Sequence, residues 1–109
     1  MTIKRQIRES PITQGTGEII TYTLTTTPWG ASPTGVSIII YDITDTTDEV
    51  NWTNVTATVM PVNSPSVVGN VITFSPLKLL VDGRLYRAEI NFTVAMGAVE
   101  TSCLIIGGR

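Results

Sequence analysis

The sequence predicts an all-β fold, a sandwich of seven or eight antiparallel strands in two layers. Short stretches of alternating apolar and polar residues recur along the chain, with turn-forming residues between them. The apolar share of 42% suits a folded domain, and the abundant β-branched residues favour strands. No stretch has a helical repeat long enough to form a helix without packing. At 109 residues the chain has the length of one domain, which we expect to span residues 1–109.

The first two predicted strands differ in how strictly they alternate. Residues 3–8 predict an edge strand in which Ile3, Arg5 and Ile7 share one face. Residues 18–26 alternate apolar side chains with threonines, so we expect one face in the core and the other in water. Prolines and glycines separate these stretches and end the second one, as loops require.

The middle of the chain predicts one central strand and two shorter regions. Residues 36–43 are apolar on both faces, which is typical of a strand with neighbours or cover on both sides. Residues 52–60 predict one or two short strands. Residues 71–75 predict another short strand, with Ile72 and Phe74 as core residues.

The last part of the chain predicts two long strands. Residues 84–94 alternate throughout, and a tight connection at residues 96–98 leads to a closing strand at residues 99–106. We expect residues 107–109, which include two glycines, to form a tail.

The strand at residues 84–94 opens in a distinctive way. It follows a turn signal, Asp82-Gly83, and the face that we expect in the core holds Tyr86, Ala88, Ile90 and Phe92. A tyrosine that follows a turn and opens a half-buried strand resembles the tyrosine corner of an immunoglobulin-like sandwich. The resemblance implies that the Tyr86 hydroxyl ties a loop to the backbone, a structural role and not a catalytic one.

Charge and hydropathy exclude several partners. The formal net charge is −2, so the chain lacks the basic surface that nucleic acid requires. The sequence contains no apolar run of about 18 residues, so we expect no membrane span. No apolar stretch follows the basic residues near Met1, so we expect no secretory signal. The start at Met1-Thr2-Ile3-Lys4 and the end soon after the last predicted strand favour a complete small protein, and the alternative is a domain of a longer chain.

Residue types that carry catalysis or bind metals are scarce. The chain has no histidine and one cysteine, Cys103, which excludes histidine-activated nucleophiles, imidazole or thiolate zinc sites and an internal disulfide. Glu89 and Glu100 lie on strands joined by a short turn, but we expect them on a solvent face near Arg87 and not as a catalytic pair. We therefore expect no enzyme activity, no cofactor, no metal and a buried, inert thiol.

The most acidic segment, residues 42–49, holds four carboxylates in eight residues. Calcium takes oxygen ligands from such loops. The spacing does not match the calcium-loop pattern of alternating acids, and the segment lacks the glycine that provides its sharp turn. We therefore favour a solvated loop over a calcium site.

Two tryptophans, Trp29 and Trp52, lie in stretches that resemble loops. A pair of exposed tryptophans would form a platform for a sugar ring or a partner protein. The alternative is that each ring caps one open end of the sandwich. Sequence favours the capping role for Trp52 and does not decide for Trp29.

Three stretches carry a wider resemblance: residues 12–24, residues 36–42 and residues 80–92. They resemble bacterial immunoglobulin-like proteins, and the whole chain is similar to small proteins encoded among the head and tail genes of tailed phages and prophages. That resemblance implies a structural protein of the virion, located there or in the bacterial cytoplasm. It implies other virion proteins or further copies of the chain as partners, and it carries over no catalytic residues.

The predicted function is therefore a non-enzymatic structural or protein-interaction module. The predicted contact surface is the edge strand at residues 3–8, where free main-chain groups would accept a partner strand. The alternative is a module that binds carbohydrate or a cell surface through Trp29 and Trp52.

Overall fold

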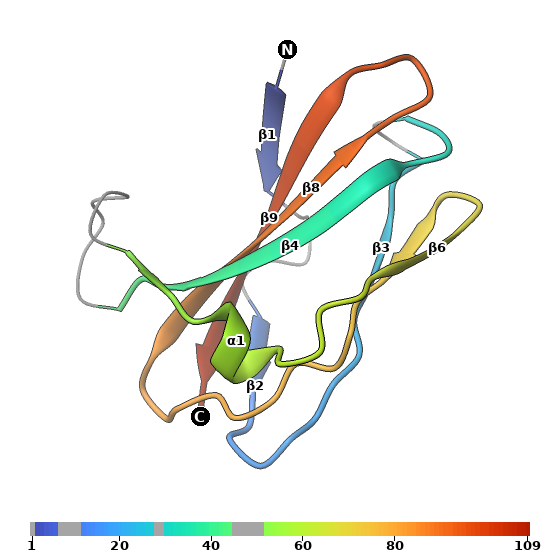
Figure 1. Cartoon of the computed structure of the whole chain (residues 1–109). Coiled ribbons are helices and arrows are strands. Elements are labelled where there is room, and N and C mark those ends of the chain that lie inside the picture. The colour runs from blue at the N-terminus through green and yellow to red at the C-terminus, as the bar shows by residue number, and fades with distance from the viewer. Residues whose placement is uncertain (1, 7–11, 28–29, 45–51) are drawn as a thin grey trace.

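The chain folds into two β-sheets that pack face to face, as the computed structural model shows for residues 2–6, 12–27, 30–44 and 52–109 (Figure 1). These residues contain nine strands and one helix of four residues. None of their helices is long and apolar enough to span a bilayer. The predicted all-β class is confirmed, because both layers are β-sheets.

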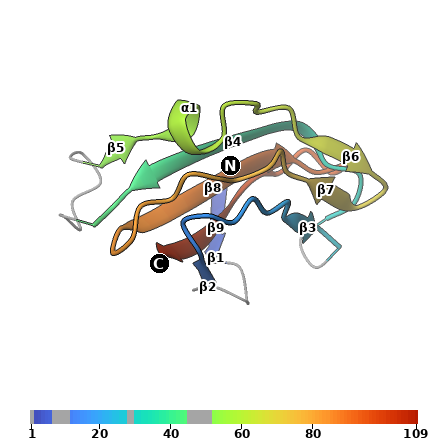
Figure 2. The same cartoon turned by 90° about the horizontal axis from the view of Figure 1, so that it is seen from below.

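The larger sheet is built around two long strands near the chain's end. Its order is β1-β9-β8-β4-β5, and β2 also pairs with β9 (Figure 2). The β8 and β9 strands pair along nine successive residues, from Leu85↔Gly107 to Thr93↔Val99. The bounds are β1, Thr2–Gln6; β2, Ile12–Gln14; β4, Thr34–Asp42; β5, Thr53–Asn54; β8, Leu85–Thr93; and β9, Val99–Gly108.

The smaller sheet has three strands of three residues each, in the order β3-β7-β6. They are β3, Thr23–Thr25; β6, Ser66–Val68; and β7, Val71–Thr73. The alternation of residues predicts β7 but not β6, although Gly69-Asn70 is a two-residue hairpin signal. Gly69 has φ +59°, a left-handed conformation that glycine adopts without a steric penalty and that this tight hairpin needs.

The core lies between the two sheets. The predicted inner face of β8 is confirmed, because Tyr86, Ala88, Ile90 and Phe92 are all buried. Ile72 and Phe74 are buried as predicted. Burial of each large apolar side chain contributes roughly 1.5–3 kcal/mol, so these residues form a substantial part of the stabilising interface between the layers. The remaining buried members include Leu24, Ile38, Ile40, Val59, Met60, Leu77, Leu80, Val94, Leu104 and Ile106.

One fully buried polar side chain, Gln14 of β2, links the larger sheet to the segments beside the smaller sheet. Its amide nitrogen donates to the Leu77 carbonyl at 2.8 Å and to the Glu18 carbonyl at 3.1 Å. Its amide oxygen accepts a hydrogen bond of 2.7 Å from the Tyr22 hydroxyl. Burial, and next the nearby Glu18 carboxylate, raise the pKa of Tyr22, which keeps this donor protonated. The joint satisfies the polar atoms that the position buries.

The expectation of an entirely antiparallel sandwich is wrong. Both β1 and β2 run parallel to β9, with Thr2 opposite Val99 and Ile12 opposite Ile106. The sequence also predicts one strand before residue 18, whereas the described residues contain two. Alternation within a strand reports which side chains share a face, and it carries no information on the direction of the partner strand.

The predicted strand at residues 18–26 is also shorter than expected. Only Thr23–Thr25 is continuous, and Ile20 adds an isolated bridge to Leu77. Between these pairings the register slips by one residue, from Leu24↔Ile72 to Ile20↔Leu77. Pro76 lies at the slip and has no N–H to continue the ladder, which accounts for the break.

The predicted strands at residues 52–60 are only partly present. The β5 strand is followed by a helix, α1, Thr56–Val59. The Asn54 side-chain oxygen accepts hydrogen bonds from the Thr56 N–H at 3.0 Å and from its hydroxyl at 2.7 Å, which turns the chain out of the strand.

The predicted tail at residues 107–109 is wrong as well, because β9 continues to Gly108. The Gly108 N–H donates to the Arg84 carbonyl, and the Gly108 carbonyl accepts from the Gly83 N–H. A Cβ atom at Gly108 would lie 2.3 Å from the Val81 carbonyl oxygen. Only glycine permits this close approach between β9 and the segment before β8.

We expect Gly108→Ala to destabilise the fold, because the added methyl group meets rigid backbone. Overpacking of this kind costs about 1–3 kcal/mol. The matched control is Gly107→Ala, whose Cβ would make an ordinary contact of 3.7 Å with the Thr13 methyl group. Thermal unfolding of both variants tests the claim, and equal melting temperatures would contradict it.

Candidate interaction surface

The predicted edge strand lies at an edge of the larger sheet. The backbone of β1 pairs with β9 from Thr2↔Val99 to Gln6↔Cys103, and no other described strand pairs with β1. In this register Ile3 lies opposite Glu100 and Arg5 opposite Ser102. Ile7 lies outside the described residues. The edge position of the predicted strand is therefore confirmed for residues 3–6.

The opposite edge of the sheet is closed by the segment around α1. Beyond β5, the Ile40 carbonyl accepts from the Val55 N–H at 2.9 Å, and the Ile40 N–H donates to the Thr56 hydroxyl at 2.8 Å. The Asn63 amide donates to the Ile38 carbonyl at 2.8 Å. These groups occupy main-chain positions that an added strand would need, which is one way in which proteins protect sheet edges.

The remaining described edges are short. The β5 strand has two residues, and β2, β3 and β6 have three each. Short edge strands offer few main-chain groups and are a second protection against pairing. Of the described edges, β1 with its five residues is therefore the longest that another chain can extend.

Trp52 packs on the outer face of the larger sheet. Its ring lies 5.1 Å from the Arg87 guanidinium carbon and 5.8 Å from the Tyr41 ring, both measured to the ring centroid. The Arg87 side chain also bonds to Glu89 Oε2 at 3.0 Å. The half-buried ring thus lies over β4 and β8, and the expected cap at an open end is wrong for Trp52. Trp29 lies outside the described residues, so the tryptophan platform stays a prediction.

Cys103 is buried, as predicted, but on the outer side of the larger sheet and not between the layers. It lies opposite Glu89 in the β8–β9 register and accepts a hydrogen bond of 2.9 Å from Arg87. The expected solvent face is therefore a half-buried polar cluster over β8 and β9.

Glu89 and Glu100 lie too far apart in the sheet to form a pair of carboxylates. Glu89 lies opposite Cys103, whereas Glu100 lies opposite Phe92. Side chains alternate along a strand, so these positions put Glu89 on the outer face and Glu100 on the core face. Glu100 is only 1% exposed, so the expected solvent-facing position is wrong for this residue.

Asp42 begins the acidic segment and is held by three hydrogen bonds. Its carboxylate accepts from the Thr44 N–H at 3.0 Å, from the Thr44 hydroxyl at 2.6 Å and from Arg84 Nε at 3.0 Å. Partial burial acts to raise the pKa of Asp42, but the bonds from Thr44 and Arg84 outweigh it and lower the pKa. The other three acids of the segment lie outside the described residues, and no metal-binding group of acids occurs within the described part.

The Tyr86 hydroxyl accepts a hydrogen bond of 2.9 Å from the Val81 N–H. The ring itself is buried against the core. The bond joins the start of β8 to the segment five residues earlier, which leads from the smaller sheet to the larger one. Tyr86 therefore fixes the path of this connection.

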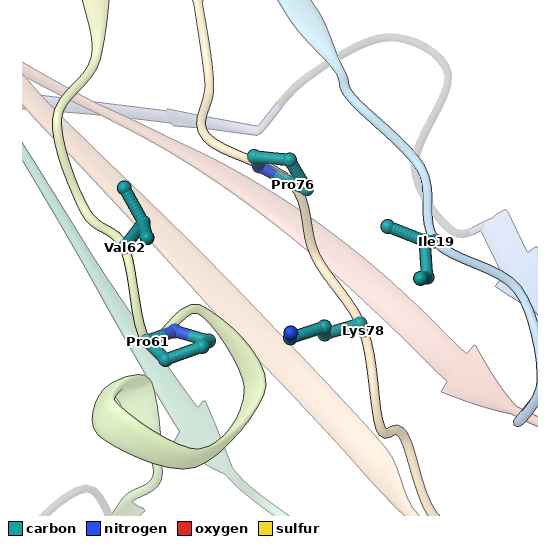
Figure 3. Close-up of a pocket in the computed structure, with 5 residues that line it drawn as sticks. All are labelled: Ile19, Pro61, Val62, Pro76 and Lys78. Carbon is teal, nitrogen blue, oxygen red and sulfur yellow. The ribbon is translucent and has the colours of Figure 1, made fainter.

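A small apolar depression lies between three segments outside the regular strands (Figure 3). Its volume is about 160 Å³, and its lining includes one charged group, the Lys78 amine. No sequence pattern predicts this depression, because residues from distant segments form it. The lining residues are Ile19, Pro61, Val62, Pro76 and Lys78.

Asp42 should stabilise the fold in a pH-dependent way. Because its folded pKa is lowered, its contribution is present above the unfolded value of about 3.9 and is lost as the pH falls through the folded value. We expect the melting temperature of the wild type to exceed that of Asp42→Asn at about pH 6–7, with a gap that narrows below about pH 4.

Arg84→Met is the companion variant, because it removes one of the bonds that lower the pKa of Asp42. It should move the loss of stability on acidification to higher pH. A difference in melting temperature between wild type and Asp42→Asn that stays constant from neutral to acidic pH would contradict the stabilising role of the ionised Asp42 carboxylate.

The chain matches no protein-family model, and no curated protein or solved structure is significantly similar to it.

Proposed function

We propose that this chain is a non-enzymatic interaction module of immunoglobulin-like architecture, which joins the virion of a tailed phage or prophage by strand addition at β1. The observation that carries the proposal is the contrast between the edges of the larger sheet. The β1 edge extends over five residues, whereas groups around α1 occupy the edge of β4.

The distribution of strands supports the immunoglobulin-like part of the proposal. In that architecture the second, fourth and fifth strands form one sheet, and the third, sixth and seventh form the other. We count β1 and β2 together as the first strand and β5 as an added edge strand. The second, fourth and fifth strands are then β3, β6 and β7, which form the smaller sheet. The third, sixth and seventh are β4, β8 and β9, which lie side by side in the larger sheet. The bond from Val81 to Tyr86, at the corner between β7 and β8, matches a tyrosine corner.

The first strand departs from the arrangement in constant-type immunoglobulin domains. In that arrangement the first strand pairs in the sheet of the second strand, whereas β1 and β2 pair with the last strand, β9. The departure places the beginning of the described chain at an edge of the larger sheet, where a partner strand has access to it.

Strand addition at this edge uses main-chain hydrogen bonds for affinity and side chains for specificity. The β1 strand carries Lys4 and Arg5. A second copy in the same place would bring like charges together, which is unfavourable in cross-strand pairs. The partner strand therefore belongs to another virion protein, and acidic residues opposite Lys4 and Arg5 would favour it.

A pair of proline variants tests the β1 edge. Successive N–H groups of a strand point to opposite edges, so one of Lys4 and Arg5 directs its N–H toward β9 and the other outward. Lys4→Pro and Arg5→Pro should therefore differ: one loses a bond to β9 and has a lower melting temperature, and the other keeps its stability but loses a bond to the partner. The stable variant should show reduced incorporation into particles, and incorporation at the wild-type level would overturn the role of β1.

The virion assignment has its own test. Quantitative mass spectrometry of gradient-purified particles, produced from the genome that encodes the chain, should find the protein at a fixed number of copies per particle. Its absence from particles, with the protein present in the lysate, would overturn the assignment and leave the edge argument intact.

A further inference from the structure

The depression of Figure 3 lies where the smaller sheet is interrupted. Beyond β7, the segment at residues 76–78 still pairs with the chain before β3, because the Leu77 N–H and carbonyl bond to Ile20 at 2.8 Å and 3.1 Å. On the other side the pairing of β6 with β7 ends at Ser66, and Pro65 before it has no N–H to continue the ladder. The sheet therefore opens between two segments that a complete ladder would join.

Hydrogen bonds hold the walls of this opening in place. The Lys78 N–H donates to the Val59 carbonyl at 2.9 Å, which joins the middle wall to α1. The Ser64 N–H donates to the Ser75 hydroxyl at 2.9 Å, which holds the chain after Val62 beside the same wall. A ligand that enters the depression would therefore lose little affinity to ordering of the protein.

The size and chemistry of the walls fit one apolar side chain. Figure 3 shows Ile19 on one side of the depression and Val62 on the other, and the rings of Pro61 and Pro76 complete the apolar lining. The volume of about 160 Å³ is close to the roughly 150 Å³ of a cavity that accommodates benzene. The depression therefore has room for one aromatic or branched aliphatic group.

Lys78 adds one positive charge to these apolar walls. Its half-buried side chain extends from the middle segment toward Pro61 (Figure 3). It takes no part in the ion pairs of the described residues, which involve arginines. The acid that precedes Ile19, Glu18, directs its carboxylate to the Gly15 N–H at 2.6 Å. The amine is therefore available to an anionic group that enters the depression.

We infer that the depression binds the C-terminal residue of a partner polypeptide. The side chain of that residue lies between the apolar walls, and its carboxylate accepts a charge-assisted hydrogen bond from the Lys78 amine. Because the amine is part of the lining, the anionic group of the ligand must lie within a few bonds of the apolar group. The last residue of a polypeptide carries both groups on one Cα atom.

The open shape of the site favours the end of a long chain over a free small acid. Sites for small molecules bury most of the ligand surface. Here Ile19 is 67% exposed and Val62 is 62% exposed, so one side of the ligand faces solvent. The rest of a polypeptide can leave through that side, and capture of a terminal carboxylate is a recurring mode of peptide recognition. The inference does not depend on strand addition at β1, which lies in the other sheet.

NMR titration of the labelled chain with three probes tests the inference. The probes are acetyl-Gly-Gly-Phe with a free carboxylate, the same peptide with an amidated C-terminus, and phenylacetate. We expect the free-acid peptide to shift the signals of Ile19, Val62 and Lys78, with a dissociation constant about fivefold below that of the amide. Phenylacetate should bind no more tightly than the free-acid peptide.

Two pairs of variants separate the charge from the walls. Lys78→Met should remove the preference for the free acid, whereas a merely structural Lys78 would change both affinities alike. Its matched control is Arg109→Met, at an exposed residue outside the lining, which should keep the preference. Val62→Glu should weaken binding of the free acid, because it places a carboxylate beside Lys78, and its control is Val68→Glu at an exposed valine of β6.

Several outcomes would overturn the inference. They are equal affinities of the wild type for the acid and the amide, an acid preference that survives Lys78→Met, and unshifted signals at millimolar probe. Tighter binding of phenylacetate than of the free-acid peptide would identify a free small acid as the ligand and would overturn the polypeptide end. Each of these results leaves the test of the β1 edge unaffected.

Discussion

The fold depends on the position of β9 inside the larger sheet. On one side β9 pairs with β8 along nine residues, and on the other side it holds both β1 and β2. Its core face supplies Leu104 and Ile106, and its last residues reach the connection before β8 through Gly108. Without β9 the two N-terminal strands have no described partner strand, and the β1 edge proposed as the contact surface does not exist.

Much of the layered arrangement follows from local sequence pattern. The strict alternation of β8 and the doubly apolar β4 predict two internal strands. The β8 strand lies between β9 and β4 as predicted, whereas β4 pairs with β5 at only two residues and is otherwise bordered by the segment around α1. What the pattern does not contain are pairing direction, register slips and single-residue turns. The parallel β1, the slip at Pro76 and the turn at Asn54 each depend on a partner or a side-chain bond that alternation does not encode.

The candidate surface was predictable to a similar degree. The edge position of residues 3–6 follows from their alternation with charged residues, but the closure of the opposite edge by Thr56 and Asn63 does not, because those contacts join residues 16 and 25 positions apart.

The pairing of the first described strand with the last has a consequence for synthesis. While the ribosome makes the chain, β1 emerges about a hundred residues before the strand it pairs with, so the larger sheet cannot close until β9 has left the exit tunnel. Contacts so far apart in sequence form slowly, because chain entropy opposes them. During translation the main-chain groups of β1 therefore stay unpaired and open to unwanted strand partners, a hazard that charged residues such as Lys4 and Arg5 generally reduce on edge strands.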